Sequence, residues 1–247
     1  MHAVVEQIAA ARPDLDVRLA FLDLSAPPVD QVMDAIAAEG HSHAVVVPLL
    51  LGSAFHARVD LPGLLDAAHT RHPRLHLTQA DVLGTDARLI NALRDRIHTA
   101  RAGVQTLPPA SLIASANRNG GAPGAMPESS RSLGIAVAAV GSSSAAANAR
   151  TAEVARRLTA LTGWKTEICF ATTEPTVAEA VARLRARGAE EVLVAPWFLA
   201  PGLLTDRLIA TTPDVVHADA LGPHPALTDI ALDRYHTAVS TTLSLSA

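Results

Sequence analysis

The residue best placed for chemistry in this sequence is His56, which follows an apolar run and precedes an expected helix. The surrounding stretch, residues 48–62, reads PLLLGSAFHARVDLP. The helix is expected to start near Leu61, with Asp60 as its cap and Pro62 in its first turn. A neutral imidazole in such a loop can bind a metal ion or accept a proton near neutral pH. Position alone also fits a loop histidine without a role.

Three other features are weaker indications of a functional site. His69 and His72 are spaced as a helical zinc pair could be, but no third ligand is evident. Residues 141–148, GSSSAAAN, follow a strand and open a helix, as a phosphate-binding turn does. They lack the lysine of a P-loop and the spacing of a dinucleotide fingerprint, so a structural turn is the better interpretation. The single Cys169 excludes an internal disulfide and a cysteine-based zinc site.

The elements that position these residues occur twice, because the chain contains an internal repeat. Phe21 and Phe170 are 149 residues apart, and Pro48 and Pro196 are 148 apart. Further along, QADVLGTDARL matches HADALGPHPAL at an offset of 138. Near-constant offsets over several separate blocks indicate a duplicated unit.

Each half alternates short apolar runs with amphipathic helical patterns, which predicts an α/β fold. Helices are expected over residues 28–39, 149–161 and 175–187. Strands are expected over residues 16–22, 43–50 and 75–80 of the first half, and over 134–140, 165–171, 191–197 and 214–218 of the second. The strand runs are apolar throughout, as in parallel sheets that are covered on both faces. The sequence therefore predicts two flavodoxin-like, doubly wound parallel-sheet half-domains in tandem, with a cleft between them.

The composition indicates a globular protein with an aliphatic core, since apolar residues make up 49% of the 247 residues and aromatic residues 3%. The net charge of −4 and the lack of a basic run argue against nucleic-acid binding. No apolar run approaches the roughly 20 residues needed to cross a bilayer, and no signal peptide is visible at the start. We therefore expect a cytoplasmic protein that binds neither nucleic acid nor membranes.

The repeat also sets the expected domain limits. Residues 103–132 are rich in Gly, Pro, Ser and Ala without periodicity, which is typical of a flexible linker. This linker separates an N-terminal half-domain, residues 1–102, from a C-terminal half-domain, residues 133–247.

The first half lacks a counterpart of the segment that opens the second half. Met1 aligns with Arg150, so about 17 residues, equivalent to 133–149, are not matched. They contain a strand and the turn that follows it. A parallel sheet without that strand would leave backbone groups unpaired. We therefore expect the natural reading frame to begin upstream, or the given chain to be truncated.

The stretch VVVPLLLGSAFHARVDLP, with DVRLAFLDLSAPP before it and QADVLGTD after it, resembles the sirohydrochlorin chelatase family. Members of this family are class II chelatases that insert Fe²⁺ or Co²⁺ into the tetrapyrrole sirohydrochlorin. The resemblance extends over nearly all of both halves and is similar to the long, duplicated form of the family. It implies a metal chelatase (a lyase) of siroheme or cobalamin biosynthesis, with the divalent metal as a substrate and no organic cofactor.

The resemblance also implies roles for individual positions. The family places two histidines at the cleft, and the one in the loop after the strand ending in Pro-Leu maps onto His56. His56 would then be catalytic and a metal ligand. The other histidine, in a His-Gly-Ser/Thr motif after the first strand, would fall before Met1. In the second half, Val140 and Leu204 stand at the two histidine positions, so that half would hold substrate without binding metal.

Sirohydrochlorin carries eight carboxylates, so the resemblance implies cationic groups and helix N-termini around it. For each arginine considered, an ordinary solvated helix residue is the alternative. We expect the substrate-binding residues to be Ser53, Ala54, Phe55, Arg58 and Arg207.

Two other functions stay open on the sequence alone. Because only one of the family's two histidines is present, one alternative is a catalytically inactive tetrapyrrole- or metal-binding protein of the same fold. A flavodoxin-like phosphate- or nucleotide-binding module is the other, disfavoured by the lack of phosphate motifs. Histidine ligands suit Fe²⁺, Co²⁺ and Ni²⁺ alike. Since a duplicated chain could form its own cleft, we expect a monomer.

Overall fold

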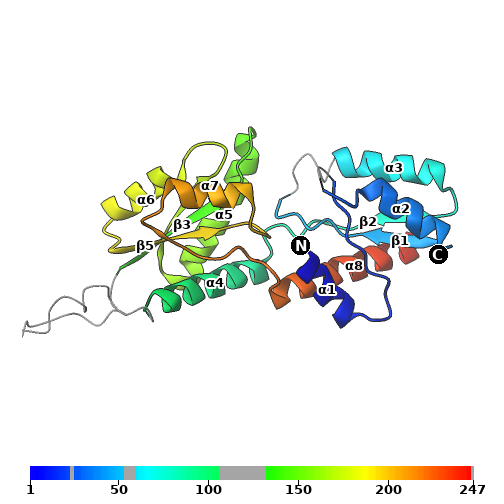
Figure 1. Cartoon of the computed structure of the whole chain (residues 1–247), viewed down its shortest axis with the longest axis horizontal. Helices are drawn as coiled ribbons and strands as arrows, with labels where there is room; N and C mark the ends of the chain where they lie inside the picture. Colours follow the sequence, from blue (N-terminus) through cyan, green and yellow to red (C-terminus); the bar gives the residue numbers. More distant parts are fainter. Residues whose placement is uncertain (23–24, 53–58, 106–131, 246–247) are drawn as a thin grey trace, which may run out of the picture. The chain divides into compact units, whose positions relative to one another are not determined.

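The computed structural model describes residues 1–22, 25–52, 59–105 and 132–245, which form two compact units. Unit 1 comprises Met1–Leu89 and Gly222–Ala247, and unit 2 comprises Ile90–Leu221. Each unit contains one parallel sheet with helices against it (Figure 1). The predicted fold class, an α/β protein with one parallel sheet per half, is confirmed. Among the described helices, none is long and apolar enough to cross a membrane.

Unit 2 contains a four-stranded parallel sheet in the order β4-β3-β5-β6. Its strands are β3 (Leu133–Ala139), β4 (Lys165–Phe170), β5 (Glu191–Pro196) and β6 (Val216–His217). The central strand β3 pairs along its length with β4 on one side and β5 on the other. All seven of its residues are buried, as the continuous apolar run predicts for a strand covered on both faces.

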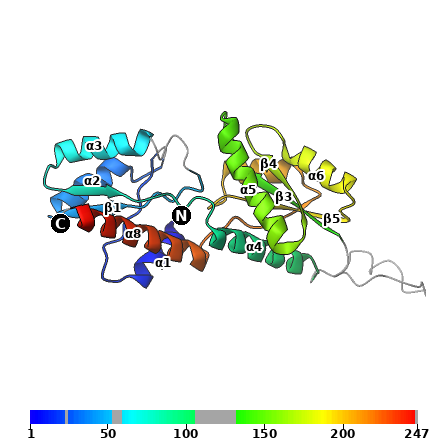
Figure 2. The same cartoon turned by 180° about the vertical axis from the view of Figure 1, so that it is seen from behind.

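Three helices connect the strands of unit 2: α5 (Ala145–Thr162), α6 (Val177–Ala186) and α7 (Leu203–Thr211). Buried residues of α6 and α7 share one apolar cluster with β3, β4 and β5, so both helices cover the same face of the sheet. The crossover from β3 to β4 runs along the sheet in the opposite direction to those from β4 to β5 and from β5 to β6, so right-handed connections put α5 on the other face (Figure 2). Helix α6 begins at a capping box, in which Thr176 and Glu179 satisfy each other's backbone N–H groups.

Unit 1 contains a two-stranded parallel sheet of β1 (His43–Val46) and β2 (His76–Gln79). Helices α2 (Val29–Ala38) and α3 (Leu61–Arg71) share an apolar cluster with both strands and cover one face. The other face is covered by α8 (Pro225–Leu245), with α1 (His2–Ala11) packed against α8 (Figure 1). The second half of the chain therefore supplies a layer of the first unit.

The strand predicted over residues 16–22 is wrong. Within the described ranges, residues 16–20 have no strand partner, and an isolated bridge joins Phe21 to Pro28. The equivalent strand in unit 2, β4, lies at the edge of the sheet as described and pairs with β3. Unit 1 has no strand equivalent to β3 among its described residues, so the segment has the composition of a strand without the partner that would make it one.

The last helix of each half packs in the other unit. Helix α4 (Ala87–Gln105) ends the first half, yet its residues from Ile90 onward belong to unit 2. There Arg101 forms an ion pair with Glu191 of β5 at 2.9 Å. Helix α8 ends the second half and belongs to unit 1, where Asp233 accepts a hydrogen bond from Arg88 at 2.6 Å. The compact units thus differ from the sequence halves by an exchange of helices.

Candidate functional site

The carboxyl edge of the unit 1 sheet is the candidate site. Because β1 and β2 are parallel, the connections that follow them, residues 47–60 and 80–86, leave the sheet at the same edge. In open parallel sheets, ligands bind outside the carboxyl ends of the strands. The two connections are joined directly, since the N–H of Gly84 donates a hydrogen bond to the carbonyl of Leu50 at 3.1 Å.

The connection after β1 contains most of the predicted site. Of the residues predicted to bind metal or substrate, Ser53, Ala54, Phe55, His56 and Arg58 lie outside the described residues, so their roles stay predictions. Helix α3 begins at Leu61 with a proline in its first turn, as expected. Asp60 precedes it without making a side-chain capping bond, because its own backbone is already helical (φ −67°, ψ −50°).

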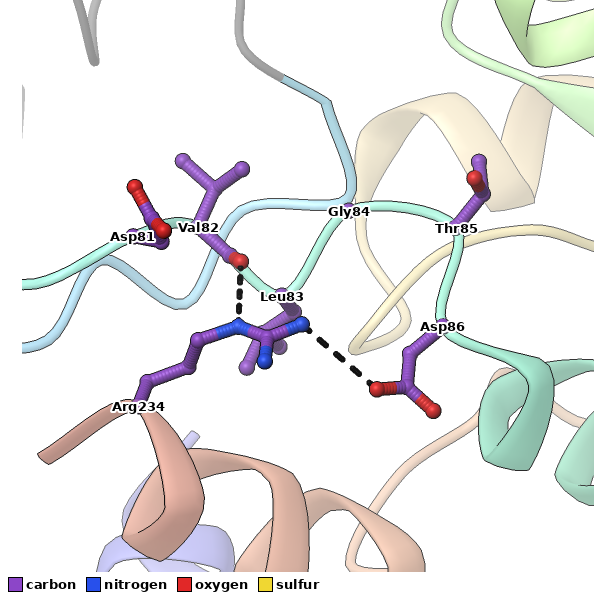
Figure 3. Close-up of a pocket in the computed structure, with 7 residues that line it drawn as sticks. All are labelled: Asp81, Val82, Leu83, Gly84, Thr85, Asp86 and Arg234. Atoms are coloured by element: carbon purple, nitrogen blue, oxygen red, sulfur yellow. Dashed lines mark hydrogen bonds and ion pairs between the residues drawn. The ribbon is translucent and has the colours of Figure 1, made fainter. Parts of the chain in front are cut away.

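The connection after β2 lines a pocket of about 480 Å³ in unit 1 (Figure 3). The Arg234 side chain reaches from α8 across the start of this loop. Its Nε donates a hydrogen bond to the carbonyl oxygen of Val82 at 3.1 Å, and its Nη2 lies 3.5 Å from an Asp86 oxygen. The pocket is lined by Asp81, Val82, Leu83, Gly84, Thr85, Asp86 and Arg234.

Charge in this pocket is organised around Asp86, whose side chain is 14% exposed. Its carboxylate accepts hydrogen bonds from the Arg88 side chain at 3.0 Å and from the Arg88 backbone N–H at 3.0 Å. The hydrogen bond from the Arg88 guanidinium is the main reason why the pKa of Asp86 is lowered, so the group is ionised at neutral pH. Asp86 therefore caps α4 and fixes the loop, which gives it a structural rather than a catalytic role.

Sequence reasoning did not single out Asp86 or Arg234, although one signal marked their loop. The segment QADVLG, residues 79–84, repeats as HADALG, residues 217–222. The two matching glycines, Gly84 and Gly222, have φ values of +64° and +58° and make the same left-handed turn. The repeat could thus have located the turn, but not its partner from α8.

In unit 2, the positions that match the family's histidines lie at the equivalent edge. Val140 follows the end of β3 and is 46% exposed, while Leu204 is half-buried in the first turn of α7. Arg207, predicted to bind substrate, is exposed in the second turn of α7. Its backbone carbonyl accepts a hydrogen bond from Thr211, and its guanidinium forms no ion pair within the described residues.

The polar groups of the serine-rich turn before α5 form hydrogen bonds with one another. The N–H of Ser142 donates to the Asn148 side chain at 2.9 Å, and the Asn148 amide donates back to the Ser142 carbonyl at 2.8 Å. Ser144 caps α5 through the N–H of Ala147. Because these polar groups bond one another, the structure agrees with a structural turn rather than a phosphate site.

Side chains of the kinds that bind metal ions also lie close together at the opposite, amino edge of the unit 1 sheet, before β1. Within the described residues, the only group of three is Asp16, Glu39 and His41, all exposed. Arg18 already lies between the two carboxylates, bonded to Asp16 at 2.6 Å and to Glu39. This cation occupies the position a metal ion would take, so we interpret the group as a surface ion-pair network.

The histidine pair considered for zinc is also engaged elsewhere. His69 contacts the backbone carbonyl of Leu75 at 3.3 Å, and His72 contacts Asp34 at 2.8 Å. The two rings therefore bond different partners, in agreement with the lack of a third ligand.

The chain is an α/β protein with two parallel sheets, one in each half. In such sheets, ligands bind at the edge formed by the carboxyl ends of the strands. The sequence model of the CbiX family matches residues 1–100 and 134–238, so the chain belongs to the CbiX family, that of the sirohydrochlorin chelatases. It is 27% identical over 209 residues to a sirohydrochlorin cobaltochelatase of Priestia megaterium, covering 82% of this chain and 61% of the relative. It is also 32% identical over 88 residues to a sirohydrochlorin cobaltochelatase of Saccharolobus solfataricus, covering 33% of this chain and 69% of the relative.

A third relative, a sirohydrochlorin ferrochelatase of Priestia megaterium, is 31% identical over 94 residues, which are 37% of this chain and 35% of the relative. The match thus covers about three fifths of the length of the Priestia megaterium cobaltochelatase and about a third of the length of the ferrochelatase from the same organism. Among solved structures, SirB from Bacillus subtilis with Fe³⁺ matches with a TM-score of 0.68 at 22% identity, over 98% of this chain and 89% of that one. SirB from Bacillus subtilis subspecies spizizenii, in complex with cobalt, matches with a TM-score of 0.63 at 21% identity, over 95% and 89%. These likenesses confirm the fold, and the predicted family resemblance is confirmed.

Proposed function

We propose that this chain is a sirohydrochlorin chelatase, which inserts Fe²⁺ or Co²⁺ into sirohydrochlorin. The observation that supports this most is the CbiX match across both halves of the repeat. The relatives named as cobaltochelatase and ferrochelatase support the substrate class, and they leave both metals as candidates. The product would serve cobalamin or siroheme biosynthesis.

The proposed reaction exchanges a divalent metal ion for two pyrrole N–H protons. The metal forms bonds to the four ring nitrogens, and two protons leave, so charge and atoms balance. His56, as a neutral imidazole, would present the metal or accept a proton, since its ordinary pKa lies close to neutrality. Iron and cobalt both accept imidazole nitrogen as a ligand. The position of His56 in the sequence, between β1 and α3, supports a role at the carboxyl edge of the unit 1 sheet.

The remaining predicted residues would hold the macrocycle. Sirohydrochlorin is polyanionic, so Arg58 and Arg207 are proposed to pair with its carboxylates. Arg207 is exposed, as a residue that meets a ligand must be. Ser53, Ala54 and Phe55 are proposed to line the site beside His56.

A spectroscopic assay tests this proposal. Purified full chain is mixed with sirohydrochlorin and Co²⁺ or Fe²⁺ under anaerobic conditions, and the absorbance change on metal insertion is followed. We expect insertion faster than the spontaneous rate. His56→Ala should reduce the accelerated rate by about 10²-fold or more, the contribution of a positioned acid–base group.

His41→Ala is the matched control, because His41 is exposed and lies before β1, at the opposite edge of the same sheet. It should leave the rate unchanged. If the full chain binds sirohydrochlorin without accelerating insertion, the inactive binding protein is the better description. If His56→Ala and His41→Ala behave alike, the role of His56 is wrong while the chelatase activity stands.

A further inference from the structure

Two histidines stand opposite each other where the strands of the unit 1 sheet begin. His43 opens β1 and His76 opens β2, and the two residues are register partners in the parallel ladder. Side chains of register partners point to the same face of a sheet. Val46 and Leu77 pack with α2 and α3, so the alternation along each strand puts both imidazoles on the opposite face. Both histidines are exposed, and a dissolved ion can therefore reach them.

The spacing of the two rings suits a shared metal ion. Their centroids lie 5.2 Å apart, and their planes are tilted by 46°. An imidazole nitrogen binds a divalent transition metal at about 2.1 Å, so two imidazoles on one tetrahedral ion have ring centres roughly 5 Å apart. The strand register thus already holds the rings at the separation that one ion needs. Rotation of the exposed side chains can then aim their nitrogens at it.

Thr78 orients the ring of His43. Its hydroxyl oxygen lies 2.9 Å from Nε2 of His43. Metal-binding histidines commonly donate their second ring N–H to an oxygen atom, which fixes the tautomer and leaves the other nitrogen for the metal. With the Nε2 proton directed to Thr78, Nδ1 of His43 is the ligand atom. Burial and the nearby His76 lower the pKa of His43, which favours the neutral imidazole that binds metal.

The repeat shows that the fold itself does not require imidazoles at these two positions. At the offsets of 148 and 138 residues, Glu191 and Asp214 are the counterparts of His43 and His76 in unit 2. Glu191 is engaged there in an ion pair with Arg101. The facing imidazoles are therefore a property of unit 1, and the duplicated sheet forms without them.

We propose that His43 and His76 form a binding site for one divalent transition metal ion, separate from the site proposed for metal insertion. The ion is bound by Nδ1 of His43 and one ring nitrogen of His76, and water completes its coordination. Imidazole ligands suit Fe²⁺, Co²⁺, Ni²⁺ and Zn²⁺. The site lies at the amino ends of the strands, whereas His56 follows β1 in the sequence. Because its two ligands come from different strands, the bound ion joins β1 to β2 and stabilises unit 1.

The first test uses Co²⁺ alone and the full chain carrying His56→Ala, which removes the proposed catalytic ligand. The paramagnetic ion broadens amide signals of the ¹⁵N-labelled chain close to where it binds. We expect saturable broadening at Ala44 and Leu77, the residues next to the two histidines. Adding His43→Ala or His76→Ala should weaken Co²⁺ binding by about tenfold or more. Thr78→Val keeps both imidazoles and should weaken it by a smaller factor.

His41→Ala is the matched control, because His41 is exposed and lies two residues before His43, in the group with Asp16 and Glu39. It should leave the Co²⁺ affinity unchanged. Metal-free spectra of all variants should match that of the parent chain outside the substituted positions, since the replaced histidines are exposed.

Zn²⁺, which is diamagnetic, measures the stabilisation. At about 100 times its Kd, an ion that binds only the folded form shifts the folding equilibrium by about a hundredfold. Amides of β1 and β2 that exchange through unfolding of unit 1 should slow by the same factor. The double variant His43→Ala, His76→Ala should show no such effect of Zn²⁺.

The proposal needs both rings, so an unchanged Co²⁺ affinity in either single histidine variant would overturn it. Loss of binding in His41→Ala would instead assign the ion to the group of Asp16, Glu39 and His41. Binding without slower exchange in β1 and β2 would mean that the ion does not join the strands, which also contradicts the proposal. None of these measurements uses the tetrapyrrole, so their result is independent of the proposed chelatase activity.

Discussion

Arg234 donates a hydrogen bond from Nε to the carbonyl oxygen of Val82 at 3.1 Å (Figure 3). This bond ties the last helix of the chain to the loop after β2. Both residues lie in unit 1, although 152 positions separate them in the sequence. The candidate edge of the first half thus depends on a side chain from the second half.

Arg234→Ala is expected to destabilise unit 1 by about 1 kcal/mol, since it removes a charged donor to the Val82 carbonyl and a contact to Asp86. The side chain is 27% exposed, so water replaces part of the loss. The measurement is the urea midpoint of unit 1, read from amide exchange in β2. Arg71→Ala is the control, because the Arg71–Asp34 pair is 43% and 51% exposed and should change stability by less than about 0.5 kcal/mol. Equal shifts for the two variants would contradict the structural role of Arg234.

Asp86→Asn is expected to make unit 1 less acid-sensitive. The pKa of Asp86 is lowered in the folded protein, chiefly by the hydrogen bond from Arg88. A carboxyl with a lowered folded pKa stabilises the fold above its unfolded pKa of about 4, and the stabilisation is lost as pH falls through the folded pKa. The variant should therefore be less stable by about 1 kcal/mol at pH 7, with the difference shrinking below pH about 4.

Urea midpoints at several pH values would measure this effect. Asp81→Asn in the same loop is the control, because Asp81 is exposed and has no ion pair in the described residues. A difference between wild type and Asp86→Asn that stays constant with pH would show that the carboxylate charge is not the cause.

Gly141→Ala is expected to destabilise unit 2 by about 2 kcal/mol or more. Gly141 has φ of +92°, and an added Cβ would lie 2.9 Å from side-chain atoms of Phe170, Thr172 and Thr173. Gly163→Ala is the matched control, with φ of +74° and no atom within 4 Å, and it should cost about 1 kcal/mol. Both tryptophans, Trp164 and Trp197, lie in unit 2, so their fluorescence in urea reports this unit. Equal midpoints would mean that the turn after β3 relaxes around the methyl group.

Arg207→Ala is expected to raise KM for sirohydrochlorin several-fold with a smaller change in kcat, if Arg207 pairs with a substrate carboxylate. Removal of uniform binding raises KM and spares kcat. Arg185→Ala is the control, since Arg185 is also exposed but lies in the last turn of α6, away from the carboxyl edge. A pure loss of kcat, or the same effect in both variants, would remove Arg207 from the substrate site.

The strands and helices of the second half could be predicted from the sequence, because each apolar run or helical pattern there forms the element that it predicts. The apolar run GIAVAAV becomes β3 and is enclosed on both sides. The first half could not, because Val17 to Phe21 have the same strand composition but no neighbouring strand among the residues that the structure describes. Strand formation is a property of the sheet, so a sequence pattern alone does not supply it.

In the candidate site, too, local sequence patterns predicted some residues and missed a residue that comes from a distant part of the chain. The loop carrying His56 was found from a motif, and its helix starts at Leu61 as predicted. Arg234 was not found, because no local pattern shows that α8 packs against the first half. The exchange of α4 and α8 depends on long-range packing, which the pattern of apolar residues within one helix does not specify.

This exchange also sets an order of assembly during synthesis. Unit 2 is one continuous stretch, Ile90–Leu221, so all of its residues are synthesised before those of α8. Unit 1 contains the first residues of the chain and also its last helix. Domains fold as units once their residues are available. The face of the β1–β2 sheet that α8 covers therefore stays uncovered until α8 has been synthesised, although both strands are made before unit 2.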